Sequence, residues 1–191
     1  MTNLETSRRP GKRERLIEAA CGLFHRQGVE ATTLADIAKT ADVPLGNVYY
    51  YFKAKDDIVR AVIDAHAGQL RDALRTFDRH RSPRARLIAF TREVAGSGPV
   101  TAQYGCPHGT LCSELDRRGD DIAEAAATLM RVRVDWAREQ FRLMGRKDAH
   151  ALALVLIAGI QGAALLANTY RDPKVLTGQA RHLQRWINSL A

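Results

Sequence analysis

Apolar residues recur at three- and four-residue spacing through almost every long segment of this chain. Leu16, Ala20 and Leu23 fall on one side of a helix with about 3.6 residues per turn. No segment shows the alternation that a half-buried strand requires, although residues 97–107 interrupt the helical period. The sequence therefore predicts an all-α protein. The longest segments with helical period are 12–27, 55–78, 119–144, 148–169 and 173–190.

The composition is that of an ordinary soluble globular protein. Of the 191 residues, 46% are hydrophobic and 26% are charged. The formal net charge is +8, which favours polyanionic partners such as nucleic acid or an acidic membrane face. Because this charge is spread along the chain, it permits DNA binding without proving it.

A basic cluster stands near the N-terminus of the chain. We expect residues 1–11 to form a flexible basic arm. Such an arm either follows the DNA backbone or enters the minor groove, or it is a disordered, solubilising tail, and the sequence leaves both open. The clustered basic residues are Arg8, Arg9, Lys12, Arg13 and Arg15.

The cysteines and the most apolar run bear on cellular location. Cys21, Cys106 and Cys112 have neither the number nor the spacing of a disulfide framework, so a reducing compartment is expected. The N-terminal segment has no apolar leader-like region. The run 151–167 carries Gln161 inside it and is short for a membrane span, so we expect a buried helix. We therefore expect a cytoplasmic protein with no membrane partner.

Residues 32–58 have the pattern of a helix-turn-helix unit, in which the second helix enters the DNA major groove. Two short helical segments are separated by about three residues. Thr33, or Thr32 before it, is suited to cap the first helix, and Asp36 follows in its first turn. Apolar residues suited to the core of the unit are Leu34, Ile37, Ala38, Val43, Val48 and Phe52.

The residues between these core positions are candidate DNA contacts. Gly46 lets the helix backbone approach DNA closely, and Asn47 has an amide that can bond a base edge. Thr33, Lys55 and the tyrosine hydroxyls can reach phosphates, whereas Leu45 offers only apolar contact. The alternative is a plain three-helix subdomain with surface tyrosines. Since few of three consecutive tyrosines can face a core, DNA binding is favoured.

A longer array of motifs surrounds this unit. The first helix ends in "LFHRQG", "TTLADIAKTADV" follows, and a G-x-x-Y-x-Y-F-x-x-K pattern begins at Gly46. At these residues, about 12–60, the chain resembles the TetR family of bacterial transcriptional regulators. The resemblance implies a DNA-binding domain over 12–58 and a C-terminal helical domain over 59–191 that dimerises and binds a small ligand. It also implies DNA contacts by Thr33, Pro44, Leu45, Gly46, Asn47, Tyr49, Tyr50 and Lys55.

Two positions depart from the family pattern. Pro44 stands where Ser or Thr is often found, and Leu45 stands where a basic or polar residue is often found. The phosphate or base contacts expected at these positions are therefore missing. The function that the resemblance implies is a ligand-responsive repressor. Such a repressor binds a palindromic DNA operator as a homodimer and is released by a small molecule.

Residues 59–191 contain no recognisable catalytic or nucleotide-binding motif, so we expect no enzyme, no catalytic residue and no cofactor. The helices 148–169 and 173–190 are apolar enough to form a four-helix dimer interface, although the same face could be monomer core. A ligand pocket is expected among the helices of 61–169. Its candidate lining residues, each of which could instead be ordinary core or surface, are Phe90, Cys106, Trp136, Gln140, Leu143, His150, Gln161 and Tyr170.

The segment "YGCPHGTLCSEL" (104–115) brings Cys106, His108 and Cys112 close together in sequence. No third group is evident to orient a cysteine–histidine pair, and the C-x-H-x3-C spacing is no known zinc pattern, so neither catalysis nor a metal is predicted. A redox- or electrophile-sensing regulator acting through Cys106 and Cys112 is an alternative. The favoured interpretation is a glycine turn in which Thr110 caps the next helix. The pattern is similar to one in a TetR subgroup.

Overall fold

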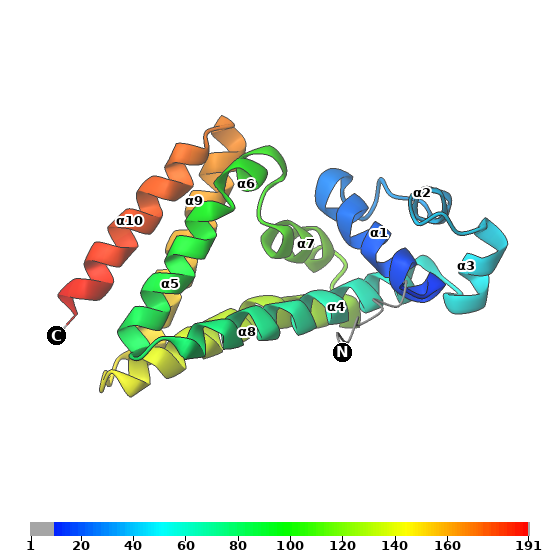
Figure 1. Cartoon of the computed structure of the whole chain (residues 1–191). Coiled ribbons are helices and arrows are strands. Elements are labelled where there is room, and N and C mark those ends of the chain that lie inside the picture. The colour runs from blue at the N-terminus through cyan, green and yellow to red at the C-terminus, as the bar shows by residue number, and fades with distance from the viewer. Residues whose placement is uncertain (1–9, 191) are drawn as a thin grey trace, which may run out of the picture. The chain divides into compact units, whose positions relative to one another are not determined.

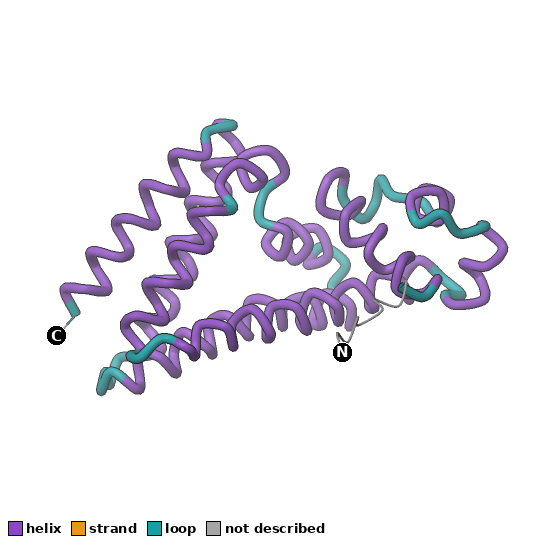
Figure 2. Tube along the Cα trace, viewed as in Figure 1, coloured by secondary structure: helices purple, strands orange, loops and turns teal. Residues whose placement is uncertain are grey.

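The computed structural model describes residues 10–190. This part of the chain forms ten α-helices and one 3-10 helix and contains no strand, as Figure 2 shows. The predicted all-α class is therefore confirmed. Most of the predicted basic arm, including Arg8 and Arg9, lies outside the described residues.

The chain divides into two compact units, Met1–Val62 and Ile63–Ala191, each of which is described by itself. The division falls inside one helix, slightly beyond the boundary predicted after residue 58. In the first unit, the described elements are α1 (Lys12–Gln27), α2 (Leu34–Thr40), α3 (Leu45–Tyr51) and the beginning of α4 (Lys55–Thr76) (Figure 1).

The core of the first unit is small and almost entirely apolar, and Thr32 is its one fully buried polar residue among those the structure describes. Leu16 and Ala20 of α1, Ile37 of α2 and Val48 of α3 have no exposed surface. Most of the residues predicted for this core are buried, but Leu34 at the start of α2 is only half-buried. This packing fixes which side of α3 faces inward, and hence which side faces solvent.

A reciprocal pair of hydrogen bonds starts α2. The hydroxyl of Thr33 accepts the Asp36 backbone N–H at 3.1 Å, and the Asp36 carboxylate accepts the Thr33 backbone N–H at 2.9 Å. The same carboxylate accepts the Thr33 hydroxyl, and these bonds hold the pKa of Asp36 below its usual value. Thr33 is thus the N-cap, which agrees with the sequence prediction.

The second unit is built around α9. This helix packs against α8, α10 and α6, while α5 packs against α8 and α10 (Figure 1). The fully buried side chains of the second unit include Leu87, Leu129, Phe141, Leu156 and Ile187. Besides the end of α4, the elements of this unit are the 3-10 helix Phe77–Arg79, α5 (Pro83–Gly96), α6 (Gly98–Tyr104), α7 (Pro107–Asp116), α8 (Asp121–Leu143), α9 (Ala149–Tyr170) and α10 (Pro173–Ser189).

Among the described residues, α9 alone is long and apolar enough to cross a membrane by length and composition. In this structure it is a core helix of the second unit. Its residues Ala153, Leu156 and Ala167 have no exposed surface, and they lie on a helix packed against three neighbours. The buried helix expected for residues 151–167 is confirmed for one side of α9, whereas Leu154, Val155, Leu165 and Leu166 on the other side are exposed.

The region 97–110 differs from the sequence expectation in two ways. Residues 97–107 interrupt the helical period in the sequence, yet most of them form a short helix, α6, with Pro99 in its first turn. The prediction that Thr110 caps the next helix is wrong, because α7 begins at Pro107 and Cys106 is its N-cap. Proline favours the first turn of a helix, so the helix starts before Thr110. The Thr110 hydroxyl instead donates to the Cys106 carbonyl at 2.9 Å.

Gly105 makes the turn between α6 and α7. Its backbone has φ 82° and ψ −179°, a region open almost only to glycine. A Cβ atom at this position would also lie 2.6 Å from Cγ2 of Thr110. Both backbone conformation and available space therefore require glycine here.

Replacing this glycine should destabilise the protein. We expect Gly105→Ala to lower the free energy of unfolding by about 1–3 kcal/mol because alanine would be strained there. The measurement is urea unfolding followed by circular dichroism. The control is Gly68→Ala in α4, where an added Cβ meets no atom within 4 Å. That change should be neutral or stabilising by up to about 1 kcal/mol. Equal effects of the two substitutions would contradict the strain argument.

Candidate nucleic-acid interface

One side of α3 is exposed although the helix is anchored on its other side. Val48 is fully buried, whereas Leu45 is 43%, Tyr49 is 50% and Tyr50 is 77% exposed. Large apolar and aromatic side chains on a short surface helix do not serve the core of the unit. They are held outward by a rigid base and are available to a partner.

The start of α3 is bare. Gly46 is exposed, and a Cβ added to it would meet no atom within 4 Å, so packing does not require glycine at this position. Pro44 is the N-cap and is exposed, but it makes no side-chain cap bond of the kind that Ser or Thr provides. Asn47 is half-buried. A partner can therefore approach the helix backbone closely at Gly46.

Lysine side chains follow α3. The Lys55 ammonium donates to the Glu30 carbonyl at 3.1 Å, which holds it against the loop before α2. The Lys53 ammonium donates to the Tyr49 carbonyl at 3.0 Å and is exposed. Lys53 was not among the residues predicted from the sequence. Its place directly after the tyrosines, two positions before Lys55, is the signal that could have identified it.

Two further interactions keep this region in place. The Asp57 carboxylate accepts the backbone N–H groups of Lys53 and Ala54 at 2.8 and 3.0 Å. The Arg13 guanidinium lies 5.4 Å from the centroid of the Phe52 ring, within the range of a cation–π contact. The backbone after α3 is thus fixed from both α1 and α4.

Two short helices joined by a turn, the second exposed and anchored, define a helix-turn-helix DNA-binding protein. Comparison with known families gives the same result. Residues 16–62 match the family described as bacterial regulatory proteins of the tetR family. Residues 83–182 match the C-terminal domain of LmrA/YxaF-like transcriptional regulators. The chain belongs to the TetR family of transcriptional regulators.

Individual relatives match over most of the chain. The transcriptional regulator AcuR of Cereibacter sphaeroides is 32% identical over 186 residues, covering 89% of this chain and 82% of that protein. LmrA of Bacillus subtilis is 26% identical over 84% of this chain and 88% of its own length. The crystal structure of a TetR regulatory protein from Rhodobacter sphaeroides is 28% identical, with a TM-score of 0.80 over 91% of this chain and 97% of that one.

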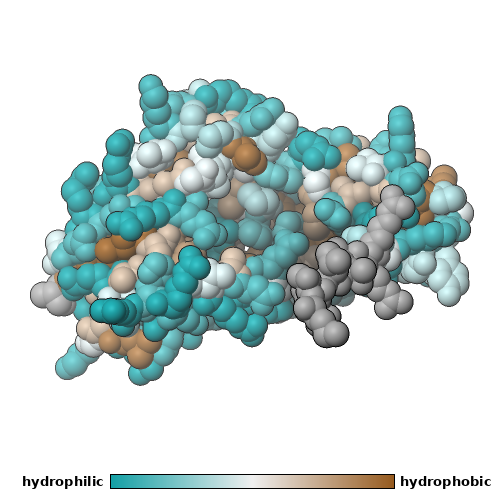
Figure 3. Space-filling model, viewed as in Figure 1, coloured by the Kyte–Doolittle hydropathy of each residue, from teal (hydrophilic) through white to brown (hydrophobic). Residues whose placement is uncertain are grey.

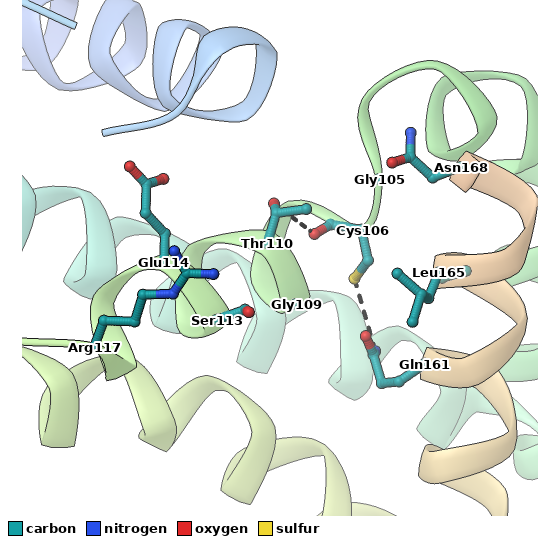
Figure 4. Close-up of a pocket in the computed structure, with 11 residues that line it drawn as sticks. Gly105, Cys106, Gly109, Thr110, Ser113, Glu114, Arg117, Gln161, Leu165 and Asn168 are labelled. Atoms are coloured by element: carbon teal, nitrogen blue, oxygen red, sulfur yellow. Dashed lines mark hydrogen bonds between the residues drawn. The ribbon is translucent and has the colours of Figure 1, made fainter. Parts of the chain in front are cut away.

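The second unit contains two cavities of interest. The first, which we call the α7–α9 pocket, has a volume of about 430 Å³ and is shown in Figure 4. Side chains from α7 face those from α9 across it, and Gln161 donates to the Cys106 sulfur at 3.7 Å. Its lining residues are Gly105, Cys106, Gly109, Thr110, Ser113, Glu114, Arg117, Gln161, Ala164, Leu165 and Asn168.

The second cavity, which we call the Arg133 cavity, has a volume of about 180 Å³. Its wall is mostly apolar and is supplied by the helices α4 to α10 and by the 3-10 helix Phe77–Arg79. Phe90 lines this cavity, and the Trp136 ring lies against Phe90 with 5.3 Å between the ring centroids. Cys106 lines both cavities. Four predicted lining residues, Phe90, Cys106, Trp136 and Gln161, therefore lie in or beside these two cavities.

The remaining predicted lining residues lie elsewhere. Gln140 is buried, and its amide oxygen accepts a hydrogen bond from Arg86 at 3.3 Å. His150 and Tyr170 lie near the two ends of α9 and are exposed, as is Leu143 at the end of α8. None of these four residues lines either cavity.

The thiol of Cys112, on α7, does not have the environment of a reactive cysteine. The Cys112 thiol donates to the Ala126 carbonyl at 3.1 Å, and burial raises its pKa from 9.0 to about 11. This thiol is therefore protonated at neutral pH, whereas a reactive cysteine needs a lowered pKa. In residues 10–190, no group of three or more His, Cys, Asp or Glu side chains is arranged to hold a metal ion.

Cys112 should alkylate slowly in the folded protein. At pH 8, raising its pKa from 9.0 to about 11 lowers the thiolate fraction about a hundredfold. We expect iodoacetamide to modify Cys112 at least about tenfold more slowly in the folded protein than in urea-unfolded protein. Peptide mass spectrometry measures both rates. Equal rates in the two states would show that burial does not protect this thiol.

Proposed function

We propose that this protein is a ligand-responsive repressor of transcription. It binds a palindromic operator as a homodimer, and a small molecule bound in its C-terminal domain releases it. Residues 12–58 bind DNA, and residues 59–191 bind the effector and dimerise. The protein acts in the cytoplasm and is not an enzyme. The observation that carries this proposal is the exposed side of α3, held outward by the burial of Val48.

The exposed side of α3 has the chemistry needed to contact a duplex. Tyrosine hydroxyls and lysine ammonium groups bind phosphates and so fix position, while the Asn47 amide can bond a base edge. Leu45, at 43% exposure, suits apolar contact with a thymine methyl. The proposed DNA contacts are Thr33, Pro44, Leu45, Gly46, Asn47, Tyr49, Tyr50 and Lys55.

The basic test of this proposal is selection of bound sites from random DNA duplexes. We expect a palindrome whose half-sites are spaced about one helical turn apart, because each subunit supplies one α3. If the protein binds no duplex more tightly than unrelated DNA at moderate salt, the proposal is wrong.

Gly46→Ala should separate DNA binding from stability. An added Cβ meets nothing in the protein, so the free energy of unfolding should stay constant or rise by up to about 1 kcal/mol. Operator affinity should fall at least about tenfold, because the methyl group would stand between helix and DNA. Fluorescence anisotropy with the selected duplex measures the affinity. Gly68→Ala, the same change on α4, is the control and should leave affinity unchanged. Full affinity of the Gly46 variant would exclude close approach at this point.

An exposed apolar stripe on α9 supports the homodimer. Leu154 and Val155 are followed about three turns later by Leu165 and Leu166, and then by Tyr170; all five are 43–67% exposed. A stripe of this length on one helix is unusual on a monomer surface. Figure 3 shows small apolar patches among mostly hydrophilic side chains on one face of the molecule. A twofold copy of the same helix would cover the stripe and pair two DNA-binding units.

Leu165→Glu should dissociate the dimer, because it would place a charge in an apolar interface. Size-exclusion chromatography with light scattering should show a dimer for the native protein and a monomer for this variant. Leu143→Glu provides the control, since Leu143 is 49% exposed at the end of α8, away from the stripe. A dimer in both variants would mean that α9 is not the interface.

Release follows if the effector stabilises a dimer geometry that no longer matches the operator. The effector then shifts a population between two conformations by binding one of them more tightly. The protonated Cys112 thiol gives no support to a redox- or electrophile-sensing regulator acting through Cys106 and Cys112.

A further inference from the structure

The Arg133 cavity has an apolar wall and one half-buried cationic side chain. Arg133 lies on α8, within the cavity lining. Glu93 also lines the cavity but is exposed, so water screens its carboxylate. The apolar lining residues are Leu70, Ala73, Leu74, Phe77, Phe90, Val94, Ile160, Ala164 and Leu176.

The Arg133 guanidinium is incompletely satisfied. One terminal nitrogen bonds Nδ1 of His108 at 2.6 Å, and the other lies 3.9 Å from the Cys106 sulfur. The remaining nitrogen, Nε, is buried and donates to nothing. No carboxylate of the described residues forms an ion pair with Arg133. A cationic group thus lies beside an apolar cavity, and its hydrogen-bond partners are an imidazole and a thiol rather than a carboxylate.

A second donor on the same helix is also unsatisfied. Trp136 follows Arg133 by three residues, and its indole N–H is buried without a partner. Its ring lies against Phe77 and Phe90, which both line the cavity. Among the described residues, these two are the only side chains with a buried nitrogen or oxygen atom that lacks a hydrogen bond.

Two such donors, three residues apart on α8, are costly in a folded protein. A buried donor without an acceptor loses its hydration and gains nothing in return, and a buried charge is ordinarily paired. A carboxylate bound in the cavity would supply both acceptor oxygens and the opposite charge. A cation would be repelled by Arg133, and a neutral molecule would leave its charge unpaired.

We infer that the Arg133 cavity binds a small apolar monocarboxylate, with its carboxylate on Arg133 and its hydrocarbon part against the apolar wall. This inference rests on the proposed function, because it names the chemical class of the effector. The cavity volume corresponds to about six water molecules, which suits a compact acid rather than a large one. One cationic side chain matches one negative charge, so a monoanion is favoured over a phosphate or a dicarboxylate.

The test compares acids with their neutral amides on the full-length protein without DNA. The probes are benzoate with benzamide and hexanoate with hexanamide, which share size and shape but differ in charge. Isothermal titration calorimetry should show at least about tenfold tighter binding of an acid than of its amide. Equal affinity within both pairs, or no binding by either acid, would overturn the inference.

Two arginine variants on α8 locate the effect. Arg133→Gln should remove the preference for acid over amide, whereas Arg131→Gln should keep it, since Arg131 is exposed two residues away. A preference that survives Arg133→Gln would overturn the assignment. Circular dichroism checks folding, and if Arg133→Gln does not fold, the comparison on the native protein still decides. Operator binding is measured separately, so failure of acid binding is distinct from failure of the proposed repressor.

Discussion

The burial of one side of α9 is the interaction on which the second unit depends. α9 packs against α8, α10 and α6, and Ala153, Leu156 and Ala167 are fully enclosed there. Because this side is filled by the same chain, most apolar residues on the other side are left exposed. One helix therefore serves both as the centre of a core and as the proposed surface for a second copy. The two tasks require an unusually apolar sequence, which explains why α9 also meets the length and composition of a membrane span.

In the first unit, α3 likewise has one side buried in the core and one side exposed. Its core is small, yet it fixes α3 firmly enough that Leu45, Tyr49 and Tyr50 project outward. Hydrogen bonds from the backbone N–H groups of Lys53 and Ala54 to the Asp57 carboxylate then fix the turn after α3. Side chains that do not contribute to stability are thereby free to be selected for contact with a partner.

Much of the fold could be predicted from the sequence because its determinants are local. Helical period, the Thr33 cap and the proline at the start of α10 act within a few residues of themselves. Thr110 has the residue type of a helix cap, but Pro107 precedes it and favours the first turn of a helix. The helix α7 therefore begins at Pro107. The exposed residues of α3 could be predicted because they lie between the apolar core positions of the helix-turn-helix. The Arg133 cavity could not be predicted from the sequence. Its character depends on which side chains seven α-helices, α4 to α10, bring together, and on the absence of a carboxylate paired with Arg133 among the described residues. No window of sequence contains that information.

Cys106 and Ala164 line both the α7–α9 pocket and the Arg133 cavity. The two spaces therefore share a wall that consists of two small side chains. A larger residue at either position would shrink both spaces together, and a smaller one would bring them closer to a single chamber. One substitution could consequently change the size of molecule that both cavities can hold, without any change to α2 or α3.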